Sequence, residues 1–134
     1  MARNILVYGH GDKSEKGFLT PEAFEQYLGG GVFREESGRY RYTQNKRADI
    51  IVLSRDGLAF GHFEVDSMET PNEEDRKAYP PVKQVYLICK SVRYERKVRM
   101  STVGISRYQF GKYISEQKFN EIVTLAGATE EFRH

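Results

Sequence analysis

Aromatic and basic side chains alternate in the segment Arg39-Tyr40-Arg41-Tyr42. A nucleobase drawn out of its stack needs a flat ring or guanidinium to stack on, and such stacking contributes roughly 1–3 kcal/mol per base. Arginines beside the rings can hold the flanking phosphates, which makes affinity fall as salt rises. We therefore expect Tyr40 and Tyr42 to contact a base, and Arg39 and Arg41 to contact phosphate. An amphipathic strand that covers the edge of a core would produce the same alternation.

Positive charge is concentrated in the second half of the chain. Between residues 83 and 118 there are nine Lys or Arg residues and two acids, whereas residues 64–75 contain six acids and no base. The formal net charge is only +2, so a basic face would arise from this segregation. A solvated surface without a ligand is the plain alternative. If the face binds nucleic acid, we expect Arg93, Arg96, Lys97 and Arg99 to hold phosphate.

A few further side chains have the chemistry to contact a base. Ser54, Asp66 and Ser67 stand near the ends of expected strands and could hydrogen-bond a Watson–Crick edge, while Phe63 could pack on the ring. His10 lies between two glycines, where a backbone can approach a ligand closely. The alternatives are a core position for Phe63, a solvated loop for Asp66 and a surface turn for His10.

Three acidic residues raise the possibility of a different class of protein. Asp49, Glu64 and Asp66 resemble the acidic spacing of PD-(D/E)xK nucleases, which need two carboxylates for Mg²⁺ and a lysine that stabilises developing charge. The residue two positions after Glu64 is an aspartate, and no lysine lies closer along the chain than Lys77. We therefore expect a binding protein without catalytic residues, and the nuclease ranks last among the alternatives.

Length and composition favour one folded domain over residues 1–134. The single cysteine, Cys89, excludes an internal disulfide and is expected to be a buried thiol. The three histidines have no zinc-ligand spacing with each other or with Cys89, so no metal or cofactor is expected. No apolar run approaches the roughly 18 residues that span a bilayer, and no signal-peptide pattern occurs. These features predict a cytoplasmic protein without a membrane partner.

The pattern of apolar residues and turn signals predicts an α+β fold with about five or six strands and two flanking helices. A helix begins at Thr20-Pro21, and the glycines that follow Leu28 end it. Asp56-Gly57 joins a hairpin, and Ser115 caps a C-terminal helix. Strands are expected over residues 4–8, 38–43, 49–54 and 58–65, and as one bent strand or two segments over 83–100, with a loop over 69–81.

These elements resemble the EVE branch of the PUA-like domains. The resemblance rests on Ala48-Asp-Ile-Ile-Val-Leu53, Gly61-His-Phe-Glu-Val65, Val92–Val98 and Ile114-Ser-Glu-Gln-Lys-Phe-Asn-Glu-Ile-Val-Thr-Leu-Ala-Gly127. It covers about residues 48–127, and the C-terminal helix is its most specific part. The chain departs from the family in lacking tryptophan and in its N-terminal loop, which has Gly9-His-Gly-Asp-Lys13 in place of a Ser/Asn-x-Pro signature.

The resemblance implies a small curled β-barrel with a concave pocket between the first loop and the central strands. Such a pocket accepts a flipped or single-stranded base. In the usual family context the domain recognises a modified base in duplex DNA for a separate nuclease or motor of a restriction system, fused or associated. RNA is the nearest alternative partner, and a PUA-like domain that binds a small molecule is the other.

Overall fold

In the computed structural model, the described residues are 3–10, 24, 31–36, 48–77, 82–105 and 112–133. The strand expected over 38–43 lies outside them, and so does the helix expected after Thr20, apart from Phe24, which is helical. No helix in the described part of the chain is long and apolar enough to cross a membrane.

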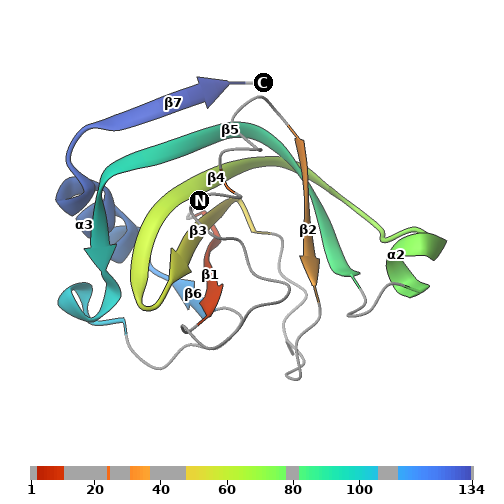
Figure 1. The fold of residues 1–134 in the computed structure, drawn as a ribbon, viewed down its shortest axis with the longest axis horizontal. Helices are drawn as coiled ribbons and strands as arrows, with labels where there is room; N and C mark the ends of the chain where they lie inside the picture. The colour runs from red at the N-terminus through yellow and green to blue at the C-terminus, as the bar shows by residue number, and fades with distance from the viewer. Residues whose placement is uncertain are drawn as a thin grey trace.

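The described strands form a mixed, seven-stranded sheet in the order β2-β5-β4-β3-β1-β6, and β7 pairs with β5 outside this path. Only β1 and β3 run parallel; the other pairs are antiparallel. Figure 1 shows β4 and β5 as long bent strands that arch over β1 and β3. The sheet that these described strands form is open, since the order has two ends. The strands are β1 (Ile5–His10), β2 (Gly31–Glu36), β3 (Ile50–Arg55), β4 (Leu58–Glu69), β5 (Val82–Arg99), β6 (Lys112–Ile114) and β7 (Thr129–Arg133).

Besides the helical residue Phe24, the helical elements within the described ranges are α2 (Glu73–Lys77), the 3₁₀ turn η2 (Met100–Val103) and α3 (Glu116–Ala126). The α+β prediction is thus confirmed at the level of a mostly β protein with helices. The last helix begins where expected, because the Ser115 hydroxyl accepts a hydrogen bond from the Lys118 amide at 3.2 Å. The hairpin of β3 and β4 is also confirmed. Its turn residues Asp56 and Gly57 have φ values of 56° and 76°, as tight hairpin turns require.

The segment expected to be a loop over 69–81 contains the short helix α2, so that prediction was wrong in part. Asn72 and Asp75 form a reciprocal cap: Asn72 Oδ1 accepts from the Asp75 amide at 2.8 Å, and Asp75 Oδ2 accepts from the Asn72 amide at 3.1 Å. The second oxygen of Asp75 accepts from Arg34 of β2 at 3.0 Å. These contacts stabilise a helical turn in a polar segment that has no apolar periodicity.

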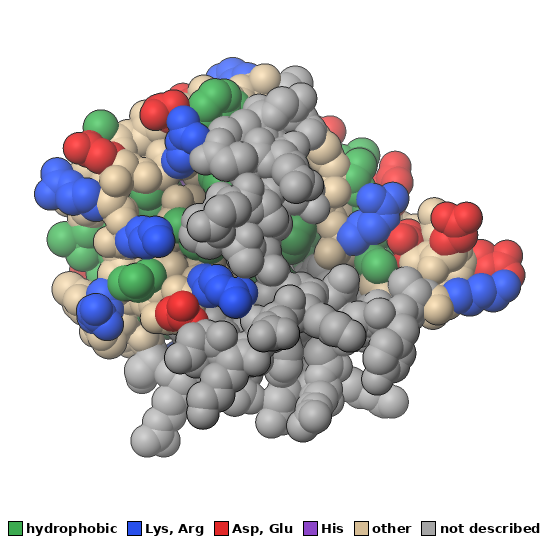
Figure 2. All heavy atoms as spheres, viewed as in Figure 1, with side chains coloured by type: hydrophobic (Ala, Val, Ile, Leu, Met, Phe, Trp, Pro, Cys, Tyr) green, Lys and Arg blue, Asp and Glu red, His purple; other side chains and the backbone are tan. Residues whose placement is uncertain are grey.

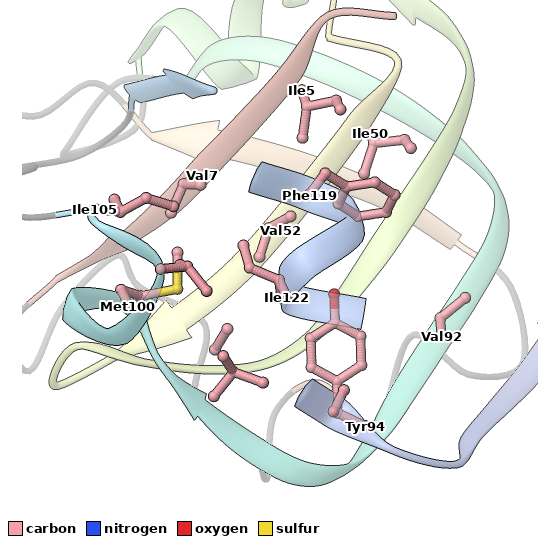
Figure 3. Packing of buried hydrophobic residues seen from close by; sticks show 14 residues of the cluster. Ile5, Val7, Ile50, Val52, Val92, Tyr94, Met100, Ile105, Phe119 and Ile122 are labelled. Carbon is pink, nitrogen blue, oxygen red and sulfur yellow. The ribbon is translucent and has the colours of Figure 1, made fainter. Parts of the chain in front are cut away.

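Both faces of the central strands are buried. Ile5 and Val7 of β1 belong to one cluster, and the alternate residues Leu6 and Tyr8 belong to another. The α3 cluster lies where α3 covers the sheet, and Figure 3 shows Phe119 and Ile122 directed toward the strands. It contains Ile5, Val7, Ile50, Val52, Ala59, Val92, Tyr94, Val98, Met100, Val103, Ile105, Phe119, Ile122 and Ala126. The aromatic cluster contains Leu6, Tyr8, Phe24, Phe33, Ala48, Ile51, Leu53, Phe60, Phe63, Val65, Tyr86 and Ile88.

A bulge in β5 lets this single strand serve both clusters. The register pairs Val65 with Ile88 but Glu64 with Lys90, so Cys89 is an extra residue on β5. Before the bulge, even-numbered residues such as Ile88 pack in the aromatic cluster, and after it they pack in the α3 cluster, beginning with Val92. The Cys89 thiol, expected to be buried, is partly exposed and donates to the Glu64 carbonyl at 3.4 Å. Residues 82–99 therefore form one continuous strand.

Gly61 of β4 lies where its strand closely approaches the neighbouring strand β5 and the Phe24 ring. A Cβ added there would lie 2.7 Å from the Val92 carbonyl oxygen and 2.9 Å from Phe24 Cζ. We expect Gly61→Ala to lower the free energy of unfolding by about 1–3 kcal/mol, because a backbone atom must shift. Urea unfolding measures this, with the exposed change Thr102→Ala as a control. A Gly61→Ala protein as stable as the control would contradict the close approach.

Candidate functional site

A second irregularity in β5 presents a row of charged side chains. Opposite the single β4 residue Phe60, the strand β5 contributes four residues, 94–97. Alternate side chains of a regular strand face opposite sides, but here Glu95, Arg96 and Lys97 are exposed in succession. Bulges of this kind redirect side chains away from the sheet. We name residues 95–97 the basic bulge. Their side chains therefore project from the surface.

The basic bulge is fastened to the turn that follows α3. The Glu95 amide donates to the Ala128 carbonyl at 3.0 Å, and Glu95 Oε2 accepts from the Ala128 amide at 2.9 Å. A Cβ added to Gly127, whose φ is 76°, would lie 2.9 Å from Arg96 Nη2. The glycine thus leaves room for the Arg96 guanidinium at the C-terminal end of α3, where a helix favours positive charge. The one carboxylate of the bulge is occupied by the backbone.

Three cations at this end of β5 are available to a ligand. Arg96, Lys97 and Arg99 are exposed, and none forms an ion pair with another described residue. Arg99 is paired in register with Leu58, which in turn faces Arg55, so a fourth cation lies two strands away. In Figure 2, Lys and Arg side chains are spread over the left part of the face, where Figure 1 has the C-terminal half of β5. Acidic side chains gather at the right edge, over α2.

Arg93, the remaining cation expected to bind phosphate on β5, is engaged by β7. Its Nη2 lies 2.8 Å from Glu130 Oε2, and its guanidinium lies 5.7 Å from the centre of the Phe132 ring. The structure therefore separates Arg93 from the three cations with which the sequence grouped it.

Two of the residues expected to contact a base lie in the core, and this corrects the expectation for both. Phe63 is 0% exposed, and its ring packs on those of Phe24 and Phe33 at centroid distances of 5.4 and 5.5 Å. Ser54 is 2% exposed, and its hydroxyl donates to the Tyr8 carbonyl at 3.5 Å. Neither position offers surface to a ligand, because neighbouring strands and rings cover it.

Of the other residues expected to contact a base, the structure describes the side chains of Asp66 and Ser67. Asp66 is exposed and Ser67 is partly exposed, both near the end of β4. His10 ends β1, but its side chain lies outside the described part. Tyr40, Tyr42, Arg39 and Arg41 also lie outside the described residues.

Two of the three acidic residues of the nuclease alternative, Asp49 and Glu64, have different partners in the structure. Asp49 Oδ2 accepts from the Asn4 amide at 2.8 Å, and Glu64 Oε2 lies 3.1 Å from Lys90 Nζ. In the part of the chain that the structure describes, no group of three or more His, Cys, Asp or Glu side chains could hold a metal ion. Lys90 reaches Glu64 from the adjacent strand β5, a proximity that the spacing along the sequence does not reveal.

A buried histidine is the polar feature that the sequence analysis did not single out. His62 Nδ1 lies 2.8 Å from the Tyr94 hydroxyl, and the His62 ring meets that of Phe119 edge-on at 5.1 Å. Burial, followed by the charges of Lys90 and Arg3, lowers the pKa of His62 to about 3. Burial also raises the pKa of Tyr94. The pair is therefore neutral near pH 7 and belongs to the core.

This histidine makes stability depend on pH. Below pH 6.5 the unfolded chain takes up a proton on His62 that the folded chain does not, so stability falls as pH falls toward 3. We expect the free energy of unfolding to drop by about 2 kcal/mol between about pH 6.5 and pH 5 because of His62. Urea unfolding of the parent and of His62→Gln, which cannot ionise, measures the difference. Equal pH dependence in the two proteins would contradict a buried neutral imidazole.

An open groove of about 730 Å³ separates η2 from α3. It is lined by Val103 and Leu125, of which Leu125 is 45% exposed, and by the polar residues Thr102, Gln117, Asn120, Glu121 and Thr124. The pocket that the family resemblance implies would lie elsewhere, beside the residues that follow β1, and residues 11–23 lie outside the described part.

Comparisons with known proteins give no relative for this chain. No family model, no curated protein and no solved structure matches it. Its function therefore has to be argued from its own residues.

Proposed function

We propose that this chain is a nucleic-acid-binding module of the EVE type, with residues 1–134 forming one PUA-like domain. The observation that carries the proposal is the set of exposed cations at the end of β5, Arg96, Lys97 and Arg99, which have no ion-pair partner among the described residues. The open, strongly bent sheet is compatible with the curled, barrel-like form of that family.

Exposed cations that have no carboxylate partner can bind the phosphate backbone of a nucleic acid. An arginine already paired with a carboxylate must exchange one anion for another, whereas these three exchange only water and counterions. A guanidinium also presents several N–H donors in a fixed plane that matches two phosphate oxygens. The contact of Glu95 with the Ala128 amide holds the bulge in place and occupies the nearest carboxylate in the sequence.

Reading of the base is the finer part of the proposal. Tyr40 and Tyr42 would supply a stacking wall for a flipped, modified base in duplex DNA, and Arg39 and Arg41 would hold the phosphates beside it. Asp66, Ser67 and His10 remain the candidates for polar contacts with the base edge. The module would then give specificity to a separate nuclease or motor.

Binding to matched oligonucleotides tests this function. Fluorescence anisotropy would compare duplexes that are unmodified or carry N6-methyladenine, 5-methylcytosine or 5-hydroxymethylcytosine, together with a single-stranded RNA of the same length. We expect one modified duplex to bind tightest, and Tyr40→Ala or Tyr42→Ala to remove that preference. Tightest binding to RNA would overturn the choice of DNA. Absence of binding to every oligonucleotide at low salt would overturn the proposed function.

A further inference from the structure

The basic bulge is not held by the neighbouring strand β4. In this described part of the sheet, none of residues 94–97 has a register partner on β4. The pairing of β5 with β7 ends at Tyr94. The residues on either side of the bulge, Tyr94 and Val98, are buried in the α3 cluster, whereas the bulge itself is exposed. Contacts outside the β4 ladder must therefore fix the conformation of the bulge.

Glu95 supplies two such contacts, both with Ala128 in the turn between α3 and β7. Its amide donates to the Ala128 carbonyl at 3.0 Å, and its Oε2 accepts from the Ala128 amide at 2.9 Å. A carboxylate that accepts from a backbone amide forms one of the stronger hydrogen bonds in proteins. Together the two bonds attach the beginning of the bulge to the turn.

Arg96, the next residue of the bulge, lies beside the same turn. A Cβ added to Gly127 would lie 2.9 Å from Arg96 Nη2, 3.1 Å from Arg96 Nε and 3.2 Å from Glu95 Oε2. The Glu95 carboxylate and the Arg96 guanidinium are thus both close to one glycine, whose lack of a side chain provides their space. Because Ala128 follows this glycine and is bonded to Glu95, the hydrogen bond also fixes the surface beside which Arg96 lies.

We propose that Glu95 is a positioning residue for phosphate binding: its side-chain contact with Ala128 orders the basic bulge and directs Arg96 toward a phosphate. This inference rests on the proposed function. Glu95 is also the acid next to Arg96 in the sequence, so its charge alone would weaken the binding of a polyanion. Positioning and charge therefore predict effects of opposite sign when the carboxylate is removed.

The test compares duplex binding by Glu95→Ala and Glu95→Gln. Both changes remove the same charge, but the glutamine oxygen can still accept from the Ala128 amide. We expect Glu95→Ala to bind on the order of tenfold more weakly than Glu95→Gln, because Arg96 must then be ordered on binding. The slope of log K against log[salt] should be shallower by about 0.9 in Glu95→Ala, since one phosphate contact is lost. Glu95→Gln should bind at least as tightly as the parent.

A second acid controls for the difference between alanine and glutamine. Glu121 is an exposed residue of α3 for which no ion pair is found within the described ranges. Glu121→Ala and Glu121→Gln should therefore bind equally. Glu95 is exposed as well, so we expect all four variants to fold, and thermal unfolding measures this.

A second background tests whether Glu95 acts through Arg96. In a chain that already carries Arg96→Ala, the difference in affinity between Glu95→Ala and Glu95→Gln should disappear, because there is no guanidinium left to position. A difference that stays as large in this background would overturn the assignment to Arg96.

The remaining outcomes separate the two proposals. Suppose that the parent binds duplex with a strong salt dependence and that Glu95→Ala binds as tightly as Glu95→Gln, or more tightly. This result would overturn the positioning role and leave the proposed function in place. A parent chain that binds no duplex at low salt would overturn the proposed function and the positioning role with it.

Discussion

Replacing Arg96, Lys97 and Arg99 together by alanine is expected to weaken duplex binding on the order of a hundredfold at about 0.1 M salt. The slope of log K against log[salt] should become shallower by about 2.7, because three phosphate contacts are lost at about 0.9 each. The expected loss follows from the exposure of all three side chains and from their lack of ion-pair partners among the described residues. Anisotropy titrations at several salt concentrations give both quantities.

The chain offers a matched control for this change. Arg76→Ala, Lys77→Ala and Lys112→Ala remove the same charge from α2 and β6, away from the basic bulge. All three side chains are exposed, so we expect stability to change little. Equal losses of affinity in the two triple variants would mean that only net charge matters, and the basic bulge would have no special role.

Phe63→Ala is expected to have the largest effect on stability, a loss of about 3–5 kcal/mol in the free energy of unfolding. The ring is completely buried and contacts two other phenylalanine rings. Its removal would leave a cavity between β4 and the residues that cover it. Chemical unfolding measures the loss. Since a domain of this size has a total stability of roughly 5–15 kcal/mol, the variant should be markedly easier to unfold.

The same position distinguishes a core role from a base-contacting role. Phe63→Leu keeps most of the buried volume, so it should lose less stability than Phe63→Ala and should bind oligonucleotides as the parent does. If Phe63→Leu bound weakly while its stability matched the parent, the ring would have to contact the ligand. That result would contradict the buried position of Phe63.

Features with a local cause could be predicted from the sequence. The turn Asp56-Gly57 specifies its hairpin through its backbone dihedral angles. Ser115 marks the start of α3 because its hydroxyl accepts a hydrogen bond from the amide three residues later in the chain. The short helix α2 was missed because its cause lies in a reciprocal cap that also depends on Arg34, far away in the chain. Strand β7 was missed because an exposed, acidic segment becomes a strand only by pairing with β5.

Features of the candidate site depended on register, which the sequence alone does not reveal. The basic residues of β5 looked equivalent along the chain, but pairing with β7 neutralises Arg93 and leaves Arg96 and Lys97 exposed in a bulge. The same applies to Lys90, which is distant from Glu64 in sequence and lies beside it in the sheet. The burial of Phe63 could not be predicted from alternation, because both faces of its strand are buried and the sequence pattern does not distinguish a core face from an exposed face.

The salt dependence of duplex binding by the parent chain tests the central claim most directly. With Arg96, Lys97 and Arg99 each on a phosphate, log K should fall linearly with log[salt] with a slope of about −2.7 or steeper. A slope near zero, or no binding at low salt, would contradict a phosphate-binding role for the end of β5.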